Sequence, residues 1–109
     1  MIDPSIINGV RNYLIRLQDQ GIIVSFGVIY GSQATGEAKA WSDIDLVVVS
    51  PQFDMKIDRE SINKLWRVAA RTDSRIEPIP CGDIQWREDT SSAIIEIARN
   101  TGTMVHATN

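Results

Sequence analysis

Two aspartates at the start of an apolar segment constrain this chain more than any other feature. The segment from Asp43 to Val49 ends in β-branched residues that favour strands, whereas aspartate is depleted from strands. Because side chains alternate across a strand, Asp43 and Asp45 project from one face, about 6 to 7 Å apart at the backbone, and Ile44 points the opposite way. Like charges on one face repel each other. The spacing therefore predicts a divalent metal site at the beginning of a buried strand.

A glycine and a serine follow the preceding apolar run, which covers residues 22–30. The missing side chain of Gly31 lets backbone amides approach a ligand, and a short helix can begin at Ser32, so this turn suits a phosphate. For Ser32 and the two aspartates to serve one site, the end of the first strand must lie beside the beginning of the second. The two strands are therefore predicted to be antiparallel.

The rest of the chain alternates helical and extended patterns. We expect helices over 5–20, 58–72 and from a cap at Asp89 or Thr90 to Asn100, a short helix or loop over 33–40, strands over 22–30 and 43–49, and an extended segment over 74–80. Ser5 is the expected cap of the first helix. The prolines of the 74–80 segment exclude a central strand and favour an edge. In the helix over 58–72, a stripe of apolar residues that includes Leu65 and Trp66 predicts a core position for Trp66.

A third acid, Glu77, lies on the extended segment, with Ile76 and Pro78 on its opposite face. Glu77 could converge with Asp43 and Asp45. Three clustered carboxylates are unfavourable unless some are protonated or a cation neutralises them. Magnesium is the expected cation, because it prefers oxygen ligands and commonly joins carboxylates to substrate phosphates.

Composition limits the class of protein. The chain has 109 residues, of which 43% are hydrophobic, so we expect a single domain over 1–109. The net charge of -3 argues against a long nucleic acid as substrate. One cysteine, Cys81, fits a reducing compartment and is expected to be a small buried side chain. The N-terminal residues lack the pattern of a secretion signal, and no apolar run is long enough for a membrane span, so we expect a cytoplasmic protein.

The combination of motifs resembles a known family. Gly31 and Ser32, the ten residues between Ser32 and Asp43, the acidic pair and the later acidic strand are similar to the minimal nucleotidyltransferases of the DNA polymerase β superfamily. The resemblance extends from about residue 22 to residue 80. It implies an α+β (α/β) nucleotidyltransferase fold, in which a small mixed sheet with antiparallel strands is covered by helices.

The same resemblance implies roles for the motif residues. Gly31 and Ser32 would hold the nucleoside triphosphate, Asp43 and Asp45 would bind magnesium, and Glu77 would complete the metal site and assist the acceptor hydroxyl. The hydroxyl would attack the α-phosphate in line and release pyrophosphate, a reaction that two metal ions can stabilise.

The phosphate-binding turn departs from the family pattern at one position. Many relatives have a basic residue after the Gly-Ser pair, where this chain has Gln33. The triphosphate charge would then be met by Lys39, by backbone amides or by the metal.

The resemblance also implies a function. We expect a magnesium-dependent transfer of a nucleoside monophosphate, with AMP from ATP as the leading donor, to a hydroxyl supplied by a partner. Comparable stand-alone proteins often act as antitoxins of small helical HEPN toxins. Two alternatives stay open. The chain could neutralise a partner by binding alone, which Gln33 and Glu77 favour, or it could modify a small metabolite or antibiotic in a pocket built by a homodimer.

Overall fold

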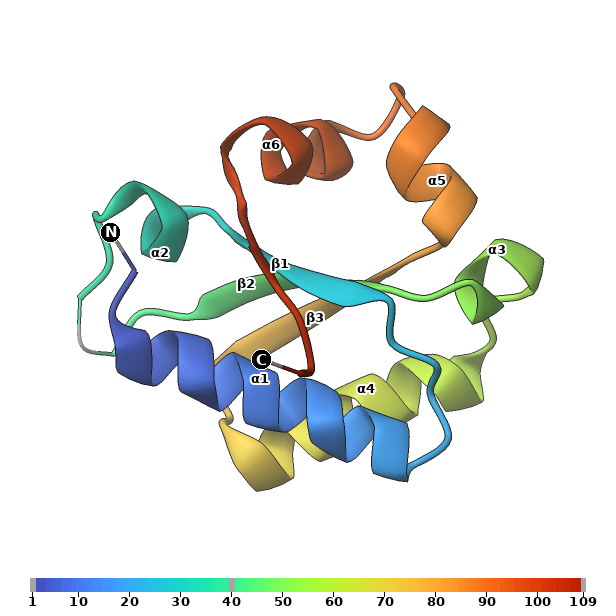
Figure 1. Ribbon diagram of the computed structural model, residues 1–109, viewed down its shortest axis with the longest axis horizontal. Helices are drawn as coiled ribbons and strands as arrows, with labels where there is room; N and C mark the ends of the chain where they lie inside the picture. Colours follow the sequence, from blue (N-terminus) through green and yellow to red (C-terminus); the bar gives the residue numbers. More distant parts are fainter. Residues whose placement is uncertain (1, 40, 109) are drawn as a thin grey trace.

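The computed structural model describes residues 2–39 and 41–108, which form a twisted sheet with helices on both faces (Figure 1). The helices are α1 (Pro4–Asp19), α2 (Ser32–Thr35), α3 (Gln52–Met55), α4 (Arg59–Thr72), α5 (Asp83–Glu88) and α6 (Ala93–Thr101), and the strands are β1 (Phe26–Tyr30), β2 (Ile44–Val49), β3 (Ile76–Cys81) and β4 (Thr103–Val105). Helices α1 and α4 cover one face of the sheet, and α5 and α6 lie over the other. The predicted α+β fold is confirmed. In the described part of the chain, no helix combines the length and the apolar character that crossing a membrane requires.

The strand order β3-β2-β1-β4 makes the sheet mixed. Strand β1 is antiparallel to both β2 and β4, whereas β2 and β3 are parallel. The end of β1 therefore meets the beginnings of β2 and β3 at the same end of the sheet. This arrangement confirms the predicted antiparallel pair and the edge position of the proline-containing strand.

Each face of the sheet has its own apolar core. The larger core joins α1 and α4 to the sheet through fully buried side chains such as Leu14, Leu46 and Leu65. The Tyr13 hydroxyl donates a hydrogen bond of 2.9 Å to the Leu65 carbonyl, which satisfies a polar group buried between the two helices. The smaller core, under α6, contains Val28, Val47, Val49, Cys81, Ile95 and Ala98. Cys81 is buried, as expected from the sequence.

Side-chain caps set the beginnings of the long helices. Asp58 caps α4 by accepting a hydrogen bond from the Ser61 amide at 2.8 Å. Helix α1 begins one residue earlier than expected, because Asp3 accepts from the Ser5 amide and Pro4 starts the helix. The expectation that Ser5 is the cap was wrong.

The last helix also has a different cap from the predicted one. Ser92 caps α6, with its hydroxyl accepting from the Ile95 amide. Asp89 instead accepts from the Ser91 amide at 2.7 Å and stabilises the preceding turn. The predicted caps Asp89 and Thr90 were therefore wrong by two to three positions, although the helix itself is confirmed.

Strand β1 is shorter than the predicted 22–30. The Ile22 amide donates to the Leu17 carbonyl, and the Ile23 amide donates to the side chain of Gln52 at 2.7 Å. These donors are used by the end of α1 and by the first residue of α3, so residues 22–24 do not join the sheet. Apolar composition alone predicted the strand too early, because the connection before a strand can have the same composition even where, as at Ile23, the side chain is exposed.

The predicted core position of Trp66 was also wrong, because its side chain is 48% exposed. Helix α4 faces the sheet with Leu65, Val68 and Ala69. Trp66 and Ile62, one turn apart, lie on the outer side of that stripe, where Ile62 is 36% exposed. A helix with apolar residues on more than one side leaves the buried side undecided until the packing is known.

Candidate active site

One row of side chains crosses three strands at the end of the sheet where α2 begins. Tyr30 on β1 is paired with Asp45 on β2, and Asp45 is paired with Glu77 on β3. Asp43 precedes Asp45 by two residues, and Ile44 between them is buried in the α1–α4 core. We call Asp43, Asp45 and Glu77 the acidic cluster. The structure brings the three sequence-predicted acids together on the face opposite α1 and α4.

The three carboxyl groups affect one another's protonation. Burial and the charge of Asp43 raise the pKa of Asp45. Burial, the charges of Asp43 and Asp45, and hydrogen bonds to both of them raise the pKa of Glu77. The hydrogen bond with Glu77 acts on Asp45 in the other direction and lowers its pKa. The hydrogen bond between Glu77 and Asp45 thus favours the protonated form of Glu77 and the ionised form of Asp45.

Tyr30 adds a hydroxyl beside the acids. Burial, followed by the charges of Asp45 and Glu77, raises the pKa of Tyr30 to about 12. The phenol therefore stays protonated at neutral pH and can act as a donor. We did not predict Tyr30 from the sequence. Its position directly before Gly31, opposite the acidic pair in an antiparallel register, was the available signal.

Gly31 is the point where the backbone touches the acidic cluster. Its φ is +73°, and a Cβ atom at this position would lie 2.5 Å from Asp45 Oδ2. Both the backbone conformation and the space therefore require glycine. The amides of Ala34 and Thr35 donate back to the Gly31 carbonyl and close the short helix α2, which begins at Ser32. The predicted glycine turn thus lies directly against the acidic cluster.

Gln33 anchors the loop that precedes the cluster. Its side chain is 8% exposed, and Nε2 lies 3.4 Å from the carbonyl oxygens of both Ser42 and Asp43 and donates to them. Ser42 and Lys39 add a reciprocal pair, in which the Lys39 amide donates to Ser42 Oγ at 2.8 Å and the Ser42 amide donates to the Lys39 carbonyl at 3.0 Å. The residue that replaces a basic side chain in the motif therefore supports the backbone of Asp43.

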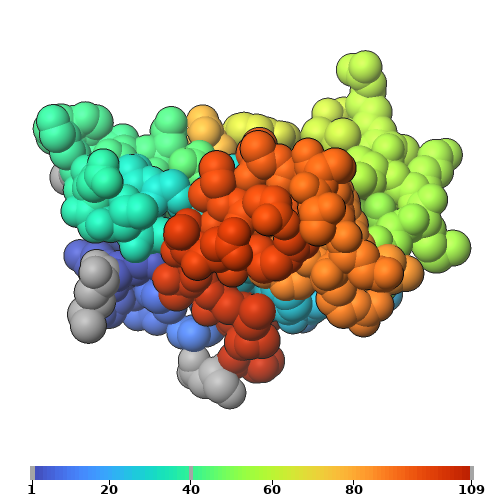
Figure 2. Space-filling view, turned by 90° about the horizontal axis from the view of Figure 1, so that it is seen from above, coloured from blue at the N-terminus to red at the C-terminus, as the bar shows by residue number. Residues whose placement is uncertain are grey.

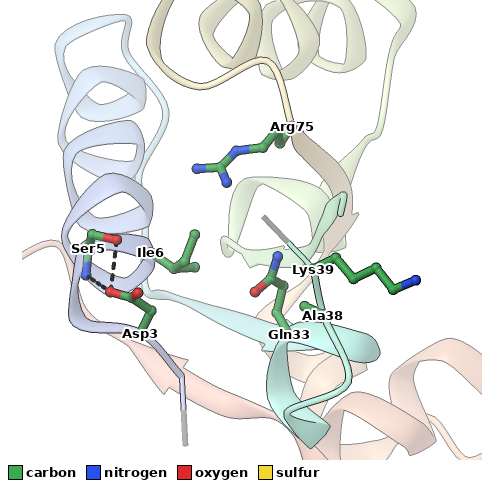
Figure 3. Close-up of a pocket in the computed structure, with 7 residues that line it drawn as sticks. All are labelled: Asp3, Ser5, Ile6, Gln33, Ala38, Lys39 and Arg75. Atoms are coloured by element: carbon green, nitrogen blue, oxygen red, sulfur yellow. Dashed lines mark hydrogen bonds between the residues drawn. The ribbon is translucent and has the colours of Figure 1, made fainter. Parts of the chain in front are cut away.

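A cavity of about 330 Å³ lies beside α2, between the beginning of α1 and the loop before Asp43 (Figure 3). It is lined by Asp3, Ser5, Ile6, Gln33, Ala38, Lys39 and Arg75. The side chain of Lys39 extends away from Gln33 and Arg75. Lys39 is also absent from the groups that shift the pKa of Asp45 or Glu77. Its role as a phosphate contact stays a prediction.

The chemistry of the acidic cluster fits a hard divalent cation. All its donors are carboxylate oxygens, and the raised pKa values of Asp45 and Glu77 reflect burial and then the charges of the neighbouring acids, both of which disfavour the ionised forms that a cation would stabilise. Among residues 2–39 and 41–108, no group of three or more acidic, histidine or cysteine side chains has the arrangement of a preformed metal site. The donor set fits magnesium, and assembly around the ion requires movement of the side chains.

Comparison with known proteins identifies the family. A family model described as a nucleotidyltransferase domain matches residues 9–100. The chain belongs to this family. This confirms the resemblance drawn from the motifs. No curated protein matches the chain in sequence.

Two solved structures share the fold of this nucleotidyltransferase domain. One is the crystal structure of a toxin–antitoxin with AMP-PNP, at a TM-score of 0.60 and 20% identity over 91% of this chain and 74% of the other. The second is a candidate nucleotidyltransferase from Sulfolobus solfataricus, at a TM-score of 0.57 and 13% identity over 90% of this chain and 77% of the other. At these identities the similarity is one of fold.

Proposed function

We propose that this nucleotidyltransferase domain transfers AMP from ATP to a hydroxyl group of a partner protein, with magnesium held by Asp43, Asp45 and Glu77. The observation that carries the proposal is the contact between the glycine turn and the acidic cluster. Because the space beside Asp45 Oδ2 admits no Cβ at Gly31, phosphates bound by the backbone of Gly31 and Ser32 would lie next to the carboxylates. Phosphate binding and metal binding would thus share one place.

The residues of the chain have separate tasks in this reaction. Backbone amides at Gly31 and Ser32 hold the phosphates, and Gln33 keeps the loop before Asp43 in position. Bound metal ions supply charge neutralisation at the α-phosphate. The acceptor oxygen forms a bond to the α-phosphorus. The bond between that phosphorus and the oxygen that bridges the α- and β-phosphates breaks, and pyrophosphate leaves. Ionised Glu77 takes the hydroxyl proton, and burial together with the charges of Asp43 and Asp45, which raise its pKa, favours the protonated form that results.

A small helical toxin of the HEPN type is the proposed partner. A fold neighbour was crystallised as a toxin–antitoxin with AMP-PNP, whose chemistry is that of an ATP analogue. The acceptor hydroxyl would then lie on the toxin, and its modification would be one route to neutralisation.

Transfer of label from ATP carrying a radioactive α-phosphate tests the proposal. The purified protein is incubated with Mg²⁺ and the product of the adjacent gene. We expect labelling of the partner that is lost about a thousandfold in Asp45→Asn, because a site that loses a metal ligand loses most of its transition-state stabilisation. Glu88→Gln removes an exposed acid on α5, outside the acidic cluster, and is the matched control. Labelling that survives in Asp45→Asn would contradict the proposed site.

A second function, neutralisation by binding alone, is favoured by the uses of Gln33 and Lys39. Gln33 anchors a loop and Lys39 extends away from it, so neither provides the cation that relatives place next to the phosphates. Under this function, Asp43→Asn and Asp45→Asn would keep full neutralising activity, and no label would move to the partner. The same two variants therefore separate the two functions.

A further inference from the structure

A second cavity lies on the other side of the sheet from the acidic cluster. It has a volume of about 360 Å³ and is formed by α1 and α4. We call it the arginine groove. Its lining residues are Arg16, Asp19, Gln20, Arg67, Val68, Arg71 and Thr72. A chain with a net charge of -3 thus places three arginines and a single acid around one cavity.

The guanidinium groups of the arginine groove have unused donors. Among the described residues, Arg16, Arg67 and Arg71 donate no hydrogen bond, and the closest carboxylate oxygens, from Asp19 and Glu60, are 3.8 Å from Arg16 and Arg67. Such exposed pairs at that distance contribute little.

Other arginines of the same chain are bound to the protein. Arg99 donates to the carbonyls of Trp86 and Asp89, and Arg11 donates to the His106 carbonyl at 3.1 Å. Arg59 and Arg87, outside the groove, likewise donate no hydrogen bond among the described residues, so the distinguishing feature of the groove is that three such arginines line one cavity.

Helix ends explain only part of this arrangement. Arg16 and Arg71 lie in the last turns of α1 and α4, where cations oppose the negative end of the helix dipole. The end of α1 already has such a partner, because Lys64 Nζ donates to the Gln20 carbonyl at 3.0 Å. Arg67 lies in the interior of α4, one turn before Arg71, and a dipole effect does not account for it.

The geometry points to a small anion with two or more phosphoryl groups, such as a nucleoside diphosphate, as the ligand of the arginine groove. Guanidinium groups match the spacing of phosphate oxygens and bind them in pairs. The volume is in the range of about 300 to 1,000 Å³ that is typical of small-molecule sites. The net negative charge of the chain favours a free nucleotide over the backbone of a polynucleotide.

Calorimetric titration with inorganic diphosphate and with ADP tests this inference. The titrations contain EDTA, so that metal-dependent binding at the acidic cluster does not contribute. We expect saturable binding that weakens with added salt. The double variant Arg67→Gln/Arg71→Gln should bind about tenfold more weakly or worse, because hydrogen bonds to charged groups are lost. Arg59→Gln/Arg87→Gln has the same change of charge outside the groove and should bind as the wild type does.

Further measurements separate the inference from its competitors. Circular dichroism of both double variants checks that the helices are kept. Asp45→Asn should leave diphosphate binding unchanged, so failure of the proposed transferase activity would not affect this result. The inference is overturned if the wild type shows no saturable binding of diphosphate or ADP, or if both double variants bind equally. It is also overturned if a short single-stranded RNA or a polyglutamate peptide binds the groove more tightly than ADP.

Discussion

The two ends of the same sheet face have the same backbone geometry and opposite chemistry. Strands β1, β2 and β3 place one side chain each in a row near α5 and one side chain each in a row near α2. The apolar row, near α5, consists of Phe26, Val49 and Cys81. The acidic row, near α2, consists of Tyr30, Asp45 and Glu77.

The apolar row is covered and the acidic row is open. Val49 and Cys81 are fully buried, and the rings of Phe26 and Trp86 meet edge to face at 5.6 Å. In the space-filling view, the orange and red atoms of α5 and α6 form the middle of this face of the molecule (Figure 2). At the other end, Asp45 and Glu77 stay partly exposed and have raised pKa values. One end of the face contributes stability, and the other keeps charges that are unfavourable for the free protein.

The largest effect on stability is expected when a carboxylate is placed in the apolar row, in comparison with an apolar side chain placed in the acidic row. Val49→Asp should lower the free energy of unfolding by about 4 kcal/mol or more, because it buries a carboxylate without a partner. The reverse exchange, Asp45→Val, should keep or raise stability while abolishing metal-dependent nucleotide binding. Urea unfolding of the two variants measures the difference. Equal losses of stability would show that Asp45 belongs to a structural network.

A methyl group at Gly31 should lower both the stability of the fold and the binding of ATP at the acidic row. Gly31→Ala places a Cβ against Asp45 and strains a positive φ, so we expect a loss of about 1 to 3 kcal/mol and of magnesium-dependent ATP binding. Gly36→Ala is the control, since Gly36 also has a positive φ but has no atom within 4 Å of the added Cβ among the described residues. Urea unfolding and ATP titration of both variants give the comparison. If the variants lose stability and binding equally, the contact with Asp45 is irrelevant.

Removing the cover of the apolar row should affect stability alone. Trp86→Ala loses the contact with Phe26 and the interaction with Arg99, for an expected cost of about 1 to 2 kcal/mol. ATP binding should be unchanged, because the acidic row lies at the other end of the strands. Trp66→Ala, at an exposed position, should cost less than Trp86→Ala. A loss of ATP binding in Trp86→Ala would show that the two ends are coupled.

The smallest expected effect is a pH dependence caused by the acidic row. Because the folded-state pKa values of Asp45 and Glu77 are raised, the folded chain binds more protons than the unfolded chain between the ordinary and the raised values. Rising pH through this window should therefore destabilise the wild type relative to Asp45→Asn/Glu77→Gln, and the gap should close below the ordinary carboxylate range.

Urea unfolding of both proteins across this pH range measures the gap. Acids with lowered pKa values, such as Asp73, act in the opposite direction and cancel in this comparison. Added magnesium should reduce the gap at neutral pH. A gap that widens on acidification would exclude the assigned repulsion.

Local patterns were enough for much of the fold and for most of the candidate site. The alternation of Asp43, Ile44 and Asp45 predicted which side chains share a face, because a strand has a period of two wherever it lies. The glycine turn at the end of one strand and the two aspartates at the beginning of the next predicted that these two strands are antiparallel. The prolines of the third extended segment predicted that it is an edge strand. The short helices α3 and α5 were not predicted, because segments of four and six residues have too few turns for a periodic signal.

What the sequence determined by itself is the chemistry available: acids on one strand face, a glycine that admits a close approach, and helices with their polar and apolar sides. The tertiary structure alone decided which distant residues meet. Register between strands depends on packing against α1 and α4, and it is this register that sets Tyr30 and Glu77 on either side of Asp45. The same packing turned Trp66 outward and brought Arg16 to the arginines of α4, because the side of a helix that is buried depends on the surface it meets.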